Sequence, residues 1–289
     1  FVAKLFQYHY PSCQMKTSIY YLILVLLLFS GVQVYADKPA KTCISFKEKV
    51  ISGNAKSTYA KMPAKANRNS SHKGIILLEF DESVSDSIQV AMVAAKNAWE
   101  AVLTSQIPIF INVVYAPLEN DLALITDVYY VKEGPCQGFP SALASQITGA
   151  HVGFQDSPDA IINLNSELQW NCSFSNCVTP GYNVFTMGLR SIATALGFGS
   201  SVVQESMDKY DYANPFPTCF DNLIIDKDDR RLTSLSAGAK EFADFVTSDN
   251  LMVNTYPLYS PKQYDPFRSL VYLKTDNSIM SESIGMGDK

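Results

Sequence analysis

The stretch that most constrains the fold is Tyr182–Ser201, which reads YNVFTMGLRSIATALGFGSS. Its apolar residues recur every three or four positions, as they do on one face of an α-helix. These residues are Val184, Met187, Leu189, Ile192, Ala195 and Leu196. Asn183 suits an N-cap, and Gly197–Gly199 supplies a helix stop with glycine available for a left-handed residue. The pattern predicts a buried helix of roughly four turns, which by itself says nothing about function.

Other elements follow from the same kind of reading. A second helix is predicted over Ser85–Ser105, with Ser85 or Ser83 as its cap and Trp99 in its apolar stripe. A further helix is predicted over Ala237–Ser248. Runs rich in β-branched and aromatic residues predict three strands, namely Ile75–Phe80, Pro108–Ala116 and Ile161–Asn165. The composition, 47% hydrophobic and 18% charged, is that of an ordinary globular protein.

The central stretch resembles the active-site helix of secreted bacterial zinc metalloproteases, Y-D-x-x-[ST]-V-A-L-H-E-I-G-H-G-L-G-F-G-S-S. The residues that match its frame are Tyr182, Thr186, Leu189, Ile192 and Leu196–Ser201. The positions that carry chemistry differ. Arg190 stands at the first histidine, Ser191 at the glutamate and Thr194 at the second histidine.

Those replacements remove the chemistry of the motif. In the family, two imidazoles one helical turn apart bind one zinc ion, and the glutamate activates the zinc-bound water. The guanidinium of Arg190 stays protonated and has no lone pair for a metal. Serine and threonine hydroxyls are poor zinc ligands at neutral pH, and Ser191 cannot act as a base without a partner. We therefore expect no zinc cofactor and no catalytic residue at this turn.

Further segments resemble the same family in the same order. They are the Trp99 helix, Ala116–Leu118 (A-P-L), Pro140–Ala144, Asp159–Trp170 (D-I-x-I-x-F-N-S-x-x-x-W), Phe220–Leu223 (Y-D-R-F), Thr247–Leu251 (T-S-x-N-L), Phe267–Leu273 and Ser278–Gly287. The last two put Tyr272 at a histidine that could supply a third metal ligand, and Met280 at the family's methionine. The resemblance implies an α+β, metzincin-like protease domain over residues 74–289. Its expected form is a twisted mixed β-sheet with a backing helix and a degenerate active-site helix.

The residues before this domain are expected to fall into three parts. Residues 1–14 precede Met15 and are interpreted as an upstream translation artefact. Residues 15–36 combine Lys16, an apolar run and Val34-Tyr35-Ala36, which is typical of a cleaved secretory signal peptide. A membrane anchor is the alternative, but the run is shorter than the ~20 residues that a spanning helix needs. Residues 37–73 are expected to be an irregular leader, and further domains could follow Lys289.

Charge and cysteine content refine this interpretation. The full chain has a net charge of −5, and removal of residues 1–36 with Lys4 and Lys16 leaves 21 basic and 28 acidic residues, a net charge of −7. This acidic balance argues against nucleic acid or an anionic membrane as a partner after signal cleavage. We expect export to the periplasm or the extracellular space, where cysteines form disulfides. The candidates after Met15 are Cys43, Cys136, Cys172, Cys177 and Cys219. Cys172 and Cys177 could pair with each other or reach Cys136 or Cys219, so the pairing stays open.

Two functions are weighed on these residues. Arg190, Ser191 and Thr194 share a helix face, so they either hydrogen-bond within a polar cavity or line a retained peptide-binding cleft. In such a cleft Arg190 would replace the charge of zinc and hold a carboxylate or a peptide carbonyl. The first hypothesis is an inactive, exported metalloprotease homologue that binds a peptide or protein there or has a structural role. Tyr272 would close the cleft or pack, and Met280 would lie below it. The alternative is an active secreted hydrolase or peptidase with a displaced or unrecognised site, although no G-x-S-x-G elbow is present.

Overall fold

The computed structural model describes part of the chain. The described residues are 42–49, 75–105, 107–118, 121–131, 138–149, 151, 157–173, 180–213, 216–266, 268–275 and 278–281, with only the backbone described for 42–49, 127–131 and 148. The expected artefact at 1–14 and the expected signal peptide at 15–36 lie outside these residues. Within the described part, no helix is both long and apolar enough to cross a membrane.

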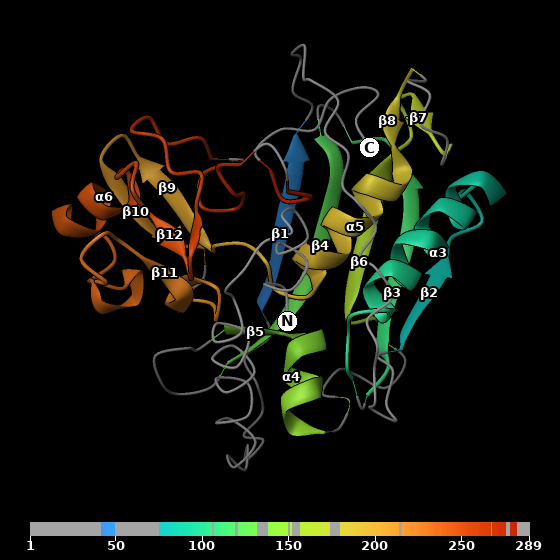
Figure 1. The fold of residues 1–289 in the computed structure, drawn as a ribbon, viewed down its shortest axis with the longest axis horizontal. Coiled ribbons are helices and arrows are strands. Elements are labelled where there is room, and N and C mark those ends of the chain that lie inside the picture. The colour runs from blue at the N-terminus through green and yellow to red at the C-terminus, as the bar shows by residue number, and fades with distance from the viewer. Residues whose placement is uncertain are drawn as a thin grey trace, which may run out of the picture.

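A mixed sheet of six strands forms the centre of the molecule (Figure 1). Its strands are β1 Thr42–Lys49, β2 Ile76–Phe80, β3 Ile109–Ala116, β4 Asp121–Val131, β5 Gly138–Pro140 and β6 Ala160–Asn165. The order is β1-β4-β6-β3-β2, with β5 beside β4. Strands β2, β3 and β6 pair in parallel, and β4 is antiparallel to β1, β5 and β6. The prediction of a mixed sheet is confirmed.

Two helices cover one face of this sheet. They are α3 (Asp86–Glu100) and α5 (Val184–Ala195), and both cross the same side of the strands in Figure 1. Burial alternates along β3, where Ile109, Ile111 and Val113 are buried and the residues between them are more exposed. The sheet therefore turns its apolar side toward the helices, and the core lies between these two layers.

The two helices approach each other closely because α5 carries a glycine at the contact. A Cβ added to Gly188 would lie 2.9 Å from the Cβ of Ala95 and 2.9 Å from the Sδ of Met92. The indole Nε1 of Trp99 donates a hydrogen bond to the carbonyl oxygen of Leu189, at 3.0 Å. Trp99 is fully buried, so its predicted role as a core residue is confirmed. These contacts fix α5 against α3.

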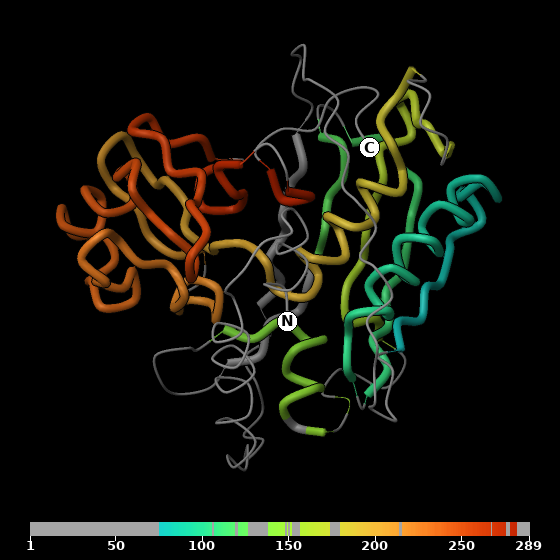
Figure 2. The backbone as a smooth tube through the Cα atoms, in the orientation of Figure 1, coloured from blue at the N-terminus to red at the C-terminus, as the bar shows by residue number. Residues whose placement is uncertain are grey.

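The remaining elements precede or follow α5 in the chain. Helix α4 (Ser141–Thr148) follows β5, and the short strands β7 (Trp170–Asn171) and β8 (Tyr182–Asn183) lead into α5. The C-terminal part, orange to red in Figure 2, lies to one side of the sheet. It contains β9 Val202–Ser206, β10 Lys209–Tyr212, η1 Asp221–Leu223, β11 Ile224–Ile225, η2 Leu232–Ser234, α6 Lys240–Val246, β12 Met252–Val253 and β13 Tyr256–Pro257. Buried side chains from both parts form one core cluster.

The α+β class is confirmed, but several boundaries differ from expectation. The helix predicted over Ser85–Ser105 ends at Glu100, and the helix predicted over Ala237–Ser248 covers only Lys240–Val246. The prediction that residues 37–73 are an irregular leader was wrong for Thr42–Lys49, which is β1. The segment is polar and rich in lysine, so its composition did not indicate a strand. Its pairing with the distant β4 is not visible in a local sequence pattern.

Candidate functional site

The structure places the turn that resembles the metalloprotease motif inside a well-capped helix. The Oδ1 of Asn183 accepts a hydrogen bond from the backbone N–H of Thr186 at 2.9 Å, which confirms the predicted N-cap. At the other end, Gly197 has φ +96° and its N–H donates to the carbonyl oxygen of Thr194 at 2.8 Å. A Cβ at position 197 would also lie 2.9 Å from Cγ of Pro140. Glycine is therefore required at this helix end, because the backbone has a positive φ and because a side chain would collide with Pro140.

Arg190 is the most unusual residue of this helix, because its charged side chain is only 2% exposed. Its Nη1 donates a hydrogen bond to the carbonyl oxygen of Ser281, at 3.1 Å. Its Cζ lies 4.6 Å from the centroid of the Tyr272 ring, within the range of a cation–π contact. The guanidinium is therefore enclosed by a segment that lies about ninety residues later in the chain.

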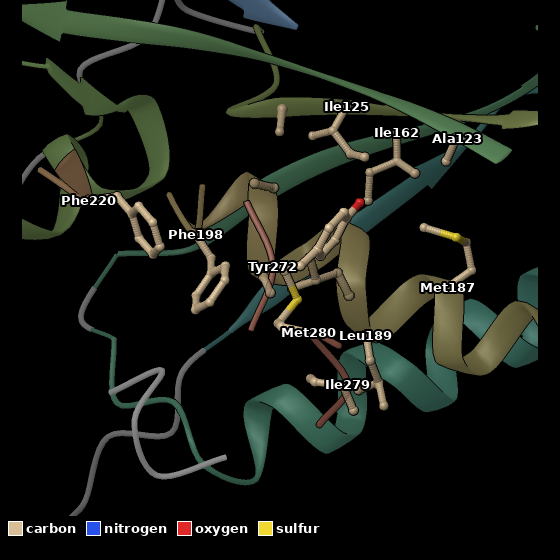
Figure 3. Close-up of a cluster of buried hydrophobic side chains, with 14 of the residues drawn as sticks. Ala123, Ile125, Ile162, Met187, Leu189, Phe198, Phe220, Tyr272, Ile279 and Met280 are labelled. Atoms are coloured by element: carbon tan, nitrogen blue, oxygen red, sulfur yellow. The ribbon is translucent and has the colours of Figure 1, made fainter. Parts of the chain in front are cut away.

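The segment that covers Arg190 also carries the other two positions that the resemblance singled out. Tyr272 and Met280 are buried, and Figure 3 shows both beside α5 in the hydrophobic cluster. The N–H of Leu273 donates to the carbonyl oxygen of Met280 at 2.7 Å, and Leu273 forms a parallel bridge with Ser281. The structure thus places Arg190, Tyr272 and Met280 in the same buried region.

Ser191 and Thr194 are brought to the same buried region but do not form the expected hydrogen-bonded cluster. Both are buried, and within the described part of the chain neither the Oγ of Ser191 nor the Oγ1 of Thr194 has a hydrogen-bond partner. A hydroxyl without a neighbouring base is a weak nucleophile. Among the described residues there is also no group of three or more histidines, cysteines or carboxylates that could hold a metal ion.

A buried carboxylate that the sequence reasoning missed lies just beyond the C-terminal end of α5. Asp221 is fully buried, and its two oxygens accept hydrogen bonds from three hydroxyl groups, those of Ser200, Ser201 and Thr218. The backbone N–H of Thr218 also donates to it at 2.7 Å. Burial raises the pKa of Asp221, and the hydrogen bonds from Ser200, Ser201 and Thr218 act in the opposite direction. We refer to these four residues as the Asp221 cluster.

The Asp221 cluster fixes the loop after α5 to the turn that contains η1. The rings of Phe198 and Phe220 pack beside it, with centroids 4.8 Å apart (Figure 3). Burial, together with the Asp221 charge, raises the pKa of the Tyr264 hydroxyl, which donates to the carbonyl oxygen of Val202 at 2.8 Å. Both Gly199–Ser201 and Phe220-Asp221 resemble segments of the metalloprotease family in sequence. No pattern in the sequence indicated that these two segments contact each other.

A second polar cluster joins α4 to the sheet and includes one of the three histidines. The Oδ1 of Asp159 accepts from the Oγ of Ser141 at 2.6 Å, and its Oδ2 accepts from the N–H of Phe110 at 2.9 Å. The Nδ1 of His151 is 3.9 Å from Asp159 Oδ1. In a catalytic triad the imidazole lies between serine and carboxylate. Here the Oγ of Ser141 donates directly to the carboxylate of Asp159. The arrangement therefore joins α4 to the sheet and does not activate Ser141 as a nucleophile.

The cysteine candidates are only partly described. Cys172 is a free thiol, and burial raises its pKa. Cys219 is disulfide-bonded. Cys136 and Cys177 lie outside the described residues, and Cys43 is described by its backbone alone.

No protein-family model, curated protein or solved structure matches this chain. The relation to zinc metalloproteases therefore stays a prediction that rests on the residue matches.

The two buried hydroxyls without partners give a first prediction. Replacing Ser191 by alanine or Thr194 by valine removes a buried polar group that makes no hydrogen bond. We expect the free energy of unfolding to stay the same or rise by up to about 1 kcal/mol. Urea unfolding of each variant measures this. A loss of stability clearly above 1 kcal/mol would show that the hydroxyl has a partner and would contradict this description.

The Asp221 cluster gives a second prediction. Asp221→Ala leaves the buried N–H of Thr218 without its acceptor and breaks the link between two loops. We expect a loss of about 2–4 kcal/mol in the free energy of unfolding. Asp228→Ala is the matched control, since that carboxylate is exposed and its loss should change stability by less than about 0.5 kcal/mol. Equal effects of the two substitutions would refute the assigned role of Asp221.

Proposed function

We propose that this chain is an exported, catalytically inactive protein with a metzincin-like domain, in which the former zinc-binding turn acts as an internal anchor. The observation that carries the proposal is the enclosure of Arg190 by Tyr272 and Ser281. In a zinc protease of this kind, the metal ion would link the helix to the later segment. Here a single guanidinium makes the corresponding link, through a carbonyl oxygen and an aromatic face.

The chemistry of the side chains supports the loss of activity. A guanidinium stays protonated at any physiological pH and can serve neither as a metal ligand nor as a general base. Ser191, at the position of the general base, has no side-chain partner among the described residues that could accept its proton. Hydrolysis by the family's route would need an imidazole pair and a carboxylate at positions that hold none of these groups.

A second version of this proposal, in which the turn binds a peptide or a protein, has less support. Because Arg190 is almost fully enclosed, a peptide could reach its guanidinium only if the stretch Ser278–Ser281 moved away. The geometry therefore favours a structural role for Arg190 over a retained cleft. Any peptide or protein ligand would then bind at another surface of the domain.

An active hydrolase with a displaced site remains the alternative function. The described residues that come nearest to such a site are Ser141, Asp159 and His151. Ser141 is buried and donates to the carboxylate, so it is neither exposed to a substrate nor paired with the imidazole. No observation in the described part of the chain favours this function over the first.

The experiment that tests the proposal combines metal analysis with a protease assay. Protein recovered after export is analysed for zinc by mass spectrometry and then incubated with casein, with and without added zinc and with and without a chelator. We expect zinc well below stoichiometric amounts and no hydrolysis that the chelator abolishes. Stoichiometric zinc together with chelator-sensitive cleavage would overturn the proposal. Cleavage that is insensitive to the chelator would favour the alternative function.

A further inference from the structure

Strand β2 lies at the edge of the central sheet, with one of its two sides open. In the order β1-β4-β6-β3-β2 it follows β3, and Figure 1 shows it at the rim of the sheet beside α3. Within the described part of the chain, no strand pairs with its other side. An edge strand presents backbone N–H and C=O groups to which another extended chain can bind.

The hydrogen bonds of β2 show which of its backbone groups point outward. The carbonyl oxygen of Ile75 accepts from the N–H of Ile109 at 2.9 Å. The N–H of Asp81 donates to the carbonyl oxygen of Val113 at 3.0 Å. The odd-numbered residues therefore bond to β3, and because the direction alternates along a strand, the even-numbered residues direct their backbone groups to the open side. These residues are Ile76, Leu78 and Phe80.

One of the outward groups is already bound. The N–H of Ile76 donates to the Oε1 of Glu100 at 2.7 Å, and the same oxygen is 2.9 Å from the Nζ of Lys96. This ion pair covers the N-terminal end of the edge, as charged side chains commonly do on edge strands. Among the described residues, none bonds to the backbone N–H or C=O groups of Leu78 and Phe80. The open stretch of β2 is therefore 78–80.

Apolar side chains lie beside this edge on the sheet face that points away from the helices. Ile75 and Leu77 are 47% and 44% exposed. Phe110 lies opposite Leu77 on β3 and is 39% exposed. Ile76, whose side chain points to the other face, is fully buried. An added strand would cover part of this exposed apolar surface, which is a favourable contribution to binding.

The C-terminal end of the same edge is acidic. Glu79, Asp81, Glu82 and Asp86 are all exposed, and residues 75–95 contain no lysine or arginine. Within the described part of the chain, none of these four carboxylates forms an ion pair with a basic side chain. The charge beside the open stretch is therefore negative, and it favours a partner that brings cations to this end.

A second copy of this chain would not supply those cations. Lys96 is the one basic residue of 75–105, and it already pairs with Glu100. Two β2 edges brought together would place two acidic segments at one interface, which is electrostatically unfavourable. The charge of the edge thus selects a basic partner over self-association.

We propose that the open side of β2 binds an extended peptide segment as an added strand, apolar in one half and rich in lysine or arginine in the other. The main chain of the peptide bonds to Leu78 and Phe80. Its apolar half packs beside Leu77 and Phe110, and its basic half lies beside Glu79 and the carboxylates that follow. This inference goes beyond the proposed function and does not depend on the state of the turn at Arg190, so the zinc experiment has no bearing on it.

Synthetic peptides test the proposal on the full chain. The probes are a dye-labelled peptide TVTVTKTK and its reverse, KTKTVTVT, since a strand can add in either direction. We expect fluorescence anisotropy to show saturable binding of at least one of them. The binding should weaken at high salt and fall at least about tenfold when glutamate replaces the lysines. Binding of neither peptide, or equal binding of the glutamate version, would overturn the proposal.

Hydrogen exchange locates the bound peptide. We expect the N–H groups of Leu78 and Phe80 to exchange more slowly in the presence of the peptide that binds. Protection confined to other parts of the chain would overturn the proposal. Light scattering without peptide should give the mass of a monomer. A dimer in which these two N–H groups are already protected would assign the edge to a second copy and would also overturn it.

Variants of the edge give an independent readout. Glu79→Lys combined with Glu82→Lys reverses two exposed charges and should weaken peptide binding at least about tenfold. Asp208→Lys combined with Asp249→Lys is the matched control, because it changes the net charge equally at exposed positions outside β2. Leu78→Pro removes one outward N–H and should also weaken binding, without breaking a bond to β3. Equal affinity of the charge-reversed variant and its control would contradict the proposal, even if the proline variant fails to fold.

Discussion

The enclosure of the Arg190 guanidinium is the constraint that the packing around α5 has to satisfy. Removing a charge from water costs several kcal/mol unless its environment compensates. Here the carbonyl oxygen of Ser281 and the ring face of Tyr272 contribute that compensation. The C-terminal segment must therefore stay against α5 for Arg190 to be tolerated inside. Conversely, Arg190 gives that segment a fixed polar contact beside the hydrophobic cluster.

The rest of the structure holds α5 in the position that this contact requires. Asn183 caps its start, Trp99 bonds a carbonyl in its middle, and the Asp221 cluster fixes the loop that follows it. Gly188 allows α3 to pack closely against it. A helix held at both ends and along one side positions its buried face well. The buried face of α5 carries one enclosed cation, Arg190, and the two hydroxyls of Ser191 and Thr194.

The sequence predicted the elements whose signals are local. Helices α3 and α5 and strands β2, β3 and β6 follow from periodicity and residue type. Strands β1 and β4 were missed because their pairing joins segments about eighty residues apart. The meeting of Arg190 with Tyr272 followed from the resemblance, whereas the degree of its burial did not, since that depends on which segment covers the helix. Asp221 was missed for a similar reason, because its partners Ser200 and Ser201 lie about twenty residues earlier.

The contact between Arg190 and Tyr272 can be measured most directly by a double-mutant cycle. The free energy of unfolding is determined for the wild type, Arg190→Gln, Tyr272→Leu and the double variant. We expect the two substitutions to be coupled by about 0.5–2 kcal/mol, since each removes the same buried contact. Additivity within about 0.3 kcal/mol, with little loss of stability from Arg190→Gln, would contradict the role of the guanidinium as an internal anchor.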